Sequence, residues 1–138
     1  MSRSLIEKLG LKKNIKALFY KAPKDVLHLF EGAEFDIKKN LAGQFDYIHY
    51  FVIHQSEMKL NFPKLKEHLK PGGTLWLSWP KASKLDSDLT IKSVIKIGYD
   101  FGLVESKAIR IDDTWSALKF TFPKEGKVYN NSYGKLAD

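Results

Sequence analysis

The chain has 138 residues, of which 43% are hydrophobic and 28% are charged, as in an ordinary globular protein of one domain. It contains no cysteine, so disulfide bridges and thiolate metal sites are excluded, and we expect a cytoplasmic protein. No apolar run approaches the roughly 20 residues of a membrane-spanning helix, and the first residues become charged too early for a signal peptide, so no membrane partner is expected.

The net charge of +7 raises nucleic acid as a partner. Residues 1–69 hold 12 basic and 8 acidic side chains, and residues 70–138 hold 11 and 8, so the two halves carry +4 and +3. Lysines spread in this way are typical of a solvated surface, and nucleic acid is therefore not the favoured partner. The four histidines form no His-x-x-x-His pair, and we expect no metal site.

The first third of the chain alternates helix and strand patterns. Ser4 and Glu7 predict a capping box that opens a short helix, and Gly10 predicts its end. Residues 16–20 predict a strand. Pro23 then suits the first position of a helix whose apolar face extends to Phe30.

Two further strands and a helix follow. Residues 34–37 predict a short strand, and the apolar, β-branched residues 46–53 predict a longer one. Ser56 is the expected cap of the next helix. Pro63 lies within the apolar helical pattern and predicts a kink or a split of that helix.

The stretch Leu69–Lys81 is the centre of the predicted fold. Pro71 predicts that the helix ends near Lys70, and Gly72 and Gly73 predict a tight turn. Residues 74–79 are almost wholly apolar, as in a strand that is covered on both faces of a mostly parallel sheet. Pro80 is expected to end the hydrogen-bonded ladder.

The rest of the chain predicts a loop, one helix and two strands. Residues 81–87 form the loop, Ser87 or Asp88 is the expected cap, and Gly98 is expected to let the helix pack closely on the sheet. The strands are residues 103–111 and 117–122. We therefore expect one domain over residues 1–122 and a polar, mobile tail over residues 123–138.

Several of these segments resemble the class I methyltransferases. The Lys-Pro-Gly-Gly turn at residues 70–73 is similar to the turn before their fifth strand, and residues 44–48 resemble the entry into their fourth. The resemblance implies a three-layer, Rossmann-like α/β fold with a mostly parallel sheet and a C-terminal antiparallel strand pair. The chain also resembles a family of small bacterial proteins without an assigned function, in residues 4–11, 21–23, 69–76, 79–81 and 113–116.

The resemblance implies an S-adenosylmethionine site, which the residues do not support. The turn after the first strand, at residues 20–25, has no glycine for a close approach of the backbone to a cofactor. Asp36 is the only acid that matches the family's ribose ligand. The connection from Asp36 to Asp46 is too short for the family's additional strand and helix, so we predict a degenerate site without a cofactor.

Ligands in open α/β sheets bind beyond the carboxyl ends of the strands. With Asp36 and the loop pair Thr114 and Trp115, this rule gives the candidate ligand-binding residues Lys21, Asp36, His54, Ser78, Trp79, Lys81, Thr114 and Trp115. No catalytic residue is assigned among them. Ser78 with His54 suggests a nucleophile and its base, but no Gly-x-Ser-x-Gly elbow surrounds Ser78, and a small polar residue in a packed strand is the favoured interpretation.

Three functions compete at this point. The first is a binding or interaction module for an unknown small molecule or protein. The second is an enzyme, such as a transferase, with an altered pocket at the strand ends, and the third is a weak nucleic-acid binder. The loops at Trp79–Lys81 and Trp115 are expected to cluster, as a ligand platform or as a plug of the sheet end.

Overall fold

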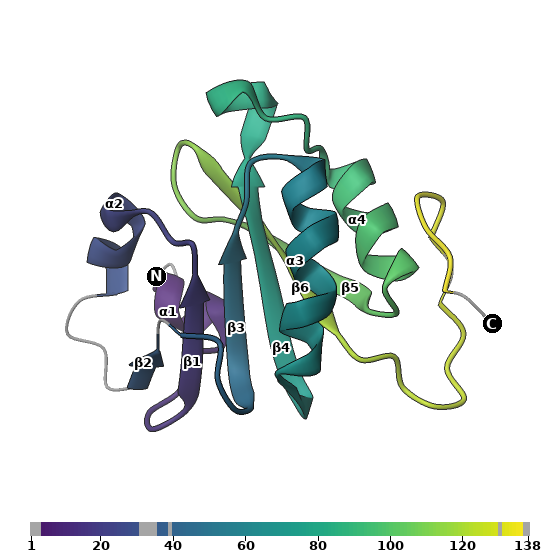
Figure 1. Cartoon of the computed structure of the whole chain (residues 1–138), viewed down its shortest axis with the longest axis horizontal. Coiled ribbons are helices and arrows are strands. Elements are labelled where there is room, and N and C mark those ends of the chain that lie inside the picture. Colours follow the sequence, from purple (N-terminus) through teal and green to yellow (C-terminus); the bar gives the residue numbers. More distant parts are fainter. Residues whose placement is uncertain (1–3, 31–35, 39, 130, 137–138) are drawn as a thin grey trace.

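The computed structural model describes residues 4–30, 36–38, 40–129 and 131–136. Its centre is a six-stranded sheet in the order β2-β1-β3-β4-β6-β5 (Figure 1). Neighbouring strands from β2 to β4 are parallel, and β6 is antiparallel to both β4 and β5. The bounds are β1 Lys16–Tyr20, β2 Asp36–Lys38, β3 Phe45–Phe51, β4 Leu69–Pro80, β5 Val104–Arg110 and β6 Trp115–Thr121. The predicted mostly parallel sheet with an antiparallel C-terminal pair is confirmed.

Helices cover both faces of this sheet. The bounds are α1 Leu5–Leu9, α2 Lys24–Leu27, α3 Gln55–Glu67 and α4 Ile91–Asp100, with 3-10 segments η1 His28–Phe30 and η2 Lys81–Asp86. The longer helices α3 and α4 lie side by side over the sheet (Figure 1). They bury apolar side chains with one face of β4, while α1 and α2 pack with the other. The fold therefore has three layers, as expected.

The two apolar clusters follow the alternation of side chains along β4. Leu75, Leu77 and Trp79 join the cluster under α3 and α4. Trp76 joins the opposite cluster, where its indole N–H donates to the carbonyl oxygen of Leu9 at 3.0 Å. Since both faces are buried, the near-continuous apolar sequence of this strand is explained.

The entry into β4 differs from the predicted turn. The helix α3 ends at Glu67, and Leu69 already pairs with Phe45 of β3, so the strand begins five residues earlier than expected. Pairing resumes between Thr74 and Tyr47, and the intervening residues 70–73 form an irregularity in which Gly72 has a φ of 81°. Pro80 is the last residue of β4, where it lies opposite Trp115, so the prediction that the ladder ends at this proline is confirmed.

Two predicted helix caps were wrong. The helix α3 begins after His54, and its first N–H, from Gln55, donates to the carboxylate of Asp88 at 2.8 Å, so Ser56 lies inside the helix. The helix α4 is capped by Thr90 in a reciprocal box with Ser93. Ser87 and Asp88 precede that helix. The Ser87 hydroxyl donates to the carbonyl oxygen of Ile53, after β3, and the Asp88 carboxylate accepts from the first N–H of α3.

Pro63 and Pro23 affect their helices differently from the prediction. The helix α3 continues through Pro63 as one element, so no split occurs. Pro23 is the residue before α2 rather than its first residue, and α2 has only four residues before it tightens into η1. The capping of α1 by Ser4 and the left-handed Gly10 are confirmed.

Gly98 brings α4 close to β6, as the sequence predicts. A Cβ atom at Gly98 would lie 2.1 Å from Cε1 of Phe120, which is far inside van der Waals contact. Phe120 is fully buried and meets Phe62 of α3 edge to face, with ring centroids 5.4 Å apart. Glycine is therefore required for the observed spacing of α4 and the sheet.

The segment after β6 contacts the domain. The side-chain amide of Asn131 donates to Glu105 of β5 at 2.7 Å, and the Lys92 ammonium of α4 lies 5.5 Å from the ring centroid of Tyr133. The mobility expected of residues 123–138 stays a prediction. Among the described residues, no helix has the length and apolar character needed to cross a membrane.

Candidate functional site

The turn after β1 holds the first candidate, Lys21. Its backbone is left-handed, with a φ of 60°, at a place where a non-glycine residue is strained. The side chain is exposed, and its ammonium lies 5.6 Å from the ring centroid of Tyr20. Pro23 contributes no N–H, and the helix that follows has a single turn, so the turn offers few donors to a phosphate or carboxylate.

Aromatic side chains fill the face of the sheet beside this turn. Phe19 of β1 meets Phe30 edge to face at 4.7 Å, and Phe51 of β3 meets Trp115 in the same way at 5.3 Å. All four are buried. The sheet is thus covered by the protein's own side chains where α2 is short.

Asp36 lies at the wrong end of its strand for a ligand site. It is the first residue of β2 and pairs with Lys16, the first residue of β1. Since the strands are parallel, Asp36 is at their amino ends, whereas ligands bind beyond the carboxyl ends. The sequence placed this strand over residues 34–37, and the shift to residues 36–38 moves Asp36 from its end to its start.

His54 and Ser78 do not pair. His54 is exposed beside α3, where its Nδ1 lies 3.2 Å from the Glu57 carboxylate. The partner of Ser78 is His49 of β3, whose Nε2 lies 2.6 Å from the serine Oγ. Ser78 is fully buried within β4, in line with the favoured interpretation of a small polar residue in a packed strand. The alternative pair with His54 does not form, because β3 and β4 run side by side and place His49 on the same face as Ser78.

His49 links Ser78 to a third polar group in the core. Its Nδ1 lies 2.9 Å from the hydroxyl of Tyr47, and all three side chains are buried. Burial lowers the pKa of His49 to about 3 and raises that of Tyr47, so both are neutral at neutral pH. Because each polar atom has a partner and no water reaches the group, this chain of hydrogen bonds is structural.

Trp79 and Trp115 are backbone neighbours but do not form one cluster. In the antiparallel register Trp79 lies opposite Ser116, and Trp115 lies opposite Pro80. Their indoles consequently enter opposite cores, Trp79 under α4 and Trp115 beside Phe51. The predicted joint platform is wrong for the two indoles, because adjacent positions in paired strands point to opposite faces.

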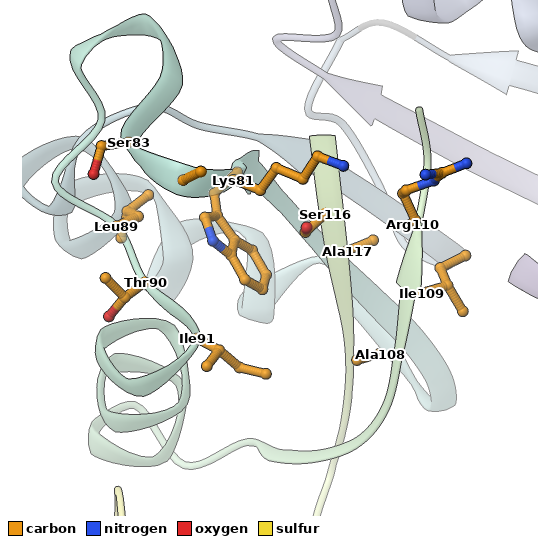
Figure 2. A pocket seen from close by; sticks show the side chains of 12 residues that line it. Lys81, Ser83, Leu89, Thr90, Ile91, Ala108, Ile109, Arg110, Ser116 and Ala117 are labelled. Carbon is orange, nitrogen blue, oxygen red and sulfur yellow. The ribbon is translucent and has the colours of Figure 1, made fainter. Parts of the chain in front are cut away.

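A pocket opens on the α4 face, beyond the carboxyl end of β4. Its volume is about 530 Å³, and it lies between η2, the start of α4 and the strands β5 and β6 (Figure 2). Of the predicted residues, it contains Trp79 and Lys81. The lining is Trp79, Lys81, Ala82, Ser83, Leu89, Thr90, Ile91, Ala108, Ile109, Arg110, Ser116 and Ala117.

One row of the sheet forms the polar side of this pocket. Trp79 of β4 lies opposite Ser116 of β6, which in turn lies opposite Arg110 of β5. The pairing places an indole, a hydroxyl and a guanidinium in line on one face. The small residue Ala108, two positions before Arg110, leaves space below the row.

Lys81 adds a second cation to this end. Its backbone N–H donates to the carbonyl oxygen of Thr114 at 2.8 Å, which anchors the chain where β4 ends. The side chain extends over β6 toward the end of β5 that carries Arg110 (Figure 2). Thr114 therefore positions Lys81 through its backbone and does not line the pocket.

The segment η2 borders the pocket in a strained conformation. Its φ values are positive at Ala82, Ser83, Leu85 and Asp86, between 53° and 58°. Lys84 holds the segment by donating to the carbonyl oxygen of Asp113 at 2.9 Å. Such strain is found at ligand sites more often than elsewhere.

Arg110 and Ser116 were not among the sequence candidates. Both strands were predicted, but the register of β5 against β6 was not, and only that register aligns the two residues with Trp79. Leu89 was placed in the first turn of the predicted helix, whereas it precedes the Thr90 cap of α4. The alternation of large apolar side chains along residues 117–122 indicated which face of that strand is buried, but it gave no indication of a ligand site.

Solved structures of methyltransferases share this arrangement of strands and helices. One is the 1,6-didemethyltoxoflavin-N1-methyltransferase of Burkholderia thailandensis with bound 1,6-didemethyltoxoflavin and S-adenosylhomocysteine, with a TM-score of 0.61 and 10% identity over 87% of this chain and 75% of that chain. The fold is that of the class I methyltransferases. The magnesium protoporphyrin IX methyltransferase of Synechocystis with bound SAH gives 0.60 at 11% identity, covering 86% and 78%. A SAM-dependent methyltransferase of Aquifex aeolicus gives 0.59 at 14%, covering 84% and 86%.

These likenesses concern the fold alone, since the identities are low. No protein-family model matches the chain, and no curated protein matches its sequence. The resemblance to small bacterial proteins therefore stays an interpretation of short segments. The described residues contain no group of three side chains suited to a metal ion.

Proposed function

We propose that this methyltransferase-like domain is a non-catalytic binding module whose S-adenosylmethionine site is degenerate. The observation that carries the proposal is the turn after β1, where Lys21, Ala22 and Pro23 stand in place of glycines. All three residues add a Cβ where the family's backbone approaches the cofactor, and Pro23 also removes an N–H. These residues do not fit the cofactor.

The position of Asp36 supports the same proposal. A carboxylate that grips ribose hydroxyls has to lie at the carboxyl end of its strand, and Asp36 begins β2 instead. The described part of the connection to β3, residues 40–44, contains no strand or helix that would form an adenine pocket.

The pocket beyond β4 supports binding rather than catalysis. Proton transfer near neutral pH is carried out mostly by histidine and by acidic side chains. No histidine, aspartate, glutamate, cysteine or tyrosine lines this pocket, whose charged and hydroxyl side chains are two cations and three hydroxyls. Lys81 is the single lining residue of a type that serves as a general acid or base, and no second such group lines the pocket with it. We therefore assign it to a ligand that is held and not transformed. The absence of cysteine keeps the cytoplasm as the proposed compartment.

Isothermal titration calorimetry with S-adenosylmethionine and S-adenosylhomocysteine tests the degenerate site. We expect no binding tighter than about 1 mM, because the turn supplies neither the close backbone nor the ribose ligand. The Synechocystis methyltransferase, whose structure holds SAH, provides a positive control in the same buffer. Micromolar binding of either compound would overturn the proposal.

A further inference from the structure

We propose that the pocket beyond β4 takes a small amphipathic anion, namely an apolar body that carries one acidic group. The inference rests on the proposed function, because it names the ligand class of that binding module. Neither half of such a ligand alone would satisfy the pocket, which is apolar on one side and cationic on the other. Both halves are argued below from the lining residues.

The apolar half of the pocket would hold the body of the ligand. Trp79 and Leu89 are buried side chains of the core that reach its wall, and Ile91 and Ala108 are exposed beside them. Ile91 is 43% exposed, which is unusual for an isoleucine at the start of a helix that packs on the sheet. A ligand of the size that fits about 530 Å³ would cover these surfaces.

The cationic half would hold the acidic group. Among the described residues, no carboxylate lies within ion-pair distance of the Lys81 ammonium, and none lines the pocket. Of the acids that the structure describes, Asp113 alone lies within ion-pair distance of Arg110, 4.0 Å from Nη1, and it is 95% exposed, so this pair is weak. Two cations and the hydroxyl of Ser116 are thus available to one anion.

The two halves also fix the orientation of the ligand. Lys81 and Arg110 lie at the ends of β4 and β5, whereas Ile91 begins α4 and Ala108 lies two residues before Arg110 on β5 (Figure 2). An anion bound at the first end would direct its apolar body along the face of β5 and β6 toward α4. A divalent or fully polar anion would leave the apolar wall in water.

Two fluorescent probes test the ligand class directly. 8-Anilinonaphthalene-1-sulfonate and N-phenyl-1-naphthylamine share one aromatic body, but only the first is an anion. We expect the anionic probe to bind about tenfold or more tightly than the neutral probe, because it alone contacts both cations. Equal dissociation constants, or no binding of either probe, would overturn the inference.

Substitutions locate the binding. We expect Lys81→Met and Arg110→Met each to weaken the anionic probe about fivefold and to leave the neutral probe unchanged. Lys59→Met, which removes an exposed lysine from α3, is the charge-matched control and should change neither. Ala108→Trp fills the pocket from an exposed strand position and should abolish binding of both probes without loss of folding.

The outcomes separate this inference from the proposed function. Anionic-probe binding that survives Ala108→Trp, or that ignores both methionine variants, would overturn the anion site, while calorimetry with S-adenosylhomocysteine still decides the degenerate cofactor site. Micromolar binding of S-adenosylhomocysteine together with the expected probe results would overturn only the proposed function. The pocket would then lie beside a working cofactor site.

Discussion

Lowering the pH from 7 to 4.5 is expected to reduce the free energy of unfolding by roughly 2 to 3 kcal/mol through His49 alone. Burial lowers the pKa of His49 from 6.5 to about 3. Between pH 6.5 and pH 3, His49 therefore binds a proton in the unfolded chain but stays neutral in the folded protein. The stabilisation is complete above pH 6.5 and is lost as the pH falls toward 3.

The surroundings of His49 offer the protonated ring no compensation. The ring stacks on Phe51 at 4.3 Å and lies near Phe19 and Trp76, and its two nitrogens contact the hydroxyls of Tyr47 and Ser78. No carboxylate is among these contacts. A positive charge would consequently be desolvated without a counter-ion, which is the physical cause of the low pKa.

Urea unfolding at several pH values measures this effect. The variant His49→Gln keeps a polar side chain between Tyr47 and Ser78 but does not titrate, so the wild-type curve minus the variant curve isolates the histidine. The difference should shrink by roughly 2 to 3 kcal/mol between pH 7 and pH 4.5. Parallel curves for the two proteins would contradict the buried, neutral histidine.

The second large effect is expected at Gly98. Gly98→Ala should lower the free energy of unfolding by about 2 kcal/mol, although alanine is the better helix former by about 1 kcal/mol. The added methyl group would lie 2.1 Å from the Phe120 ring, which is buried against Phe62 and has no free space to move into. The helix must shift away from β6, and overpacking outweighs the gain in propensity.

Thermal and urea denaturation of three variants check this. Lys96→Ala, on the exposed face of the same helix, removes a surface ion pair of 2.9 Å and is expected to cost about 0.5 kcal/mol or less. The double variant Gly98→Ala/Phe120→Leu should recover part of the loss if the ring is the obstacle. A Gly98→Ala protein as stable as the wild type would contradict the close approach.

Local signals predicted most elements of this fold. Ser4 and Gly10 mark the two ends of α1 through local contacts. Gly98 predicted that α4 packs closely on the sheet, and the structure confirms it. The caps of α3 and α4 were missed for different reasons. Asp88 caps α3 from a position 33 residues away, which no local sequence pattern reveals. Thr90 and Ser93 form a local capping pair, but the nearby Ser87 and Asp88 were chosen as the cap of α4 instead.

The candidate site was predictable only in part, because it depends on register. The sequence indicated the carboxyl end of β4, and Trp79 and Lys81 do line a pocket there. It could not tell that Trp115 faces the opposite core, or that Arg110 aligns with Trp79 through Ser116. A shift of one residue in pairing reverses each of these placements. The strand β2 begins two residues later than predicted, and this puts the ligand candidate Asp36 at its amino end.

An NMR titration of the isotope-labelled protein with S-adenosylhomocysteine tests the degenerate cofactor site most directly, since each backbone amide reports separately. Ala22 lies in the turn after β1 and Lys24 begins α2, so their amides report on the cofactor site, whereas the amide of Thr90 reports on the pocket beyond β4. We predict that the amides of Ala22 and Lys24 show no saturable shift up to about 1 mM ligand. Saturation of those two amides in the micromolar range would contradict the account.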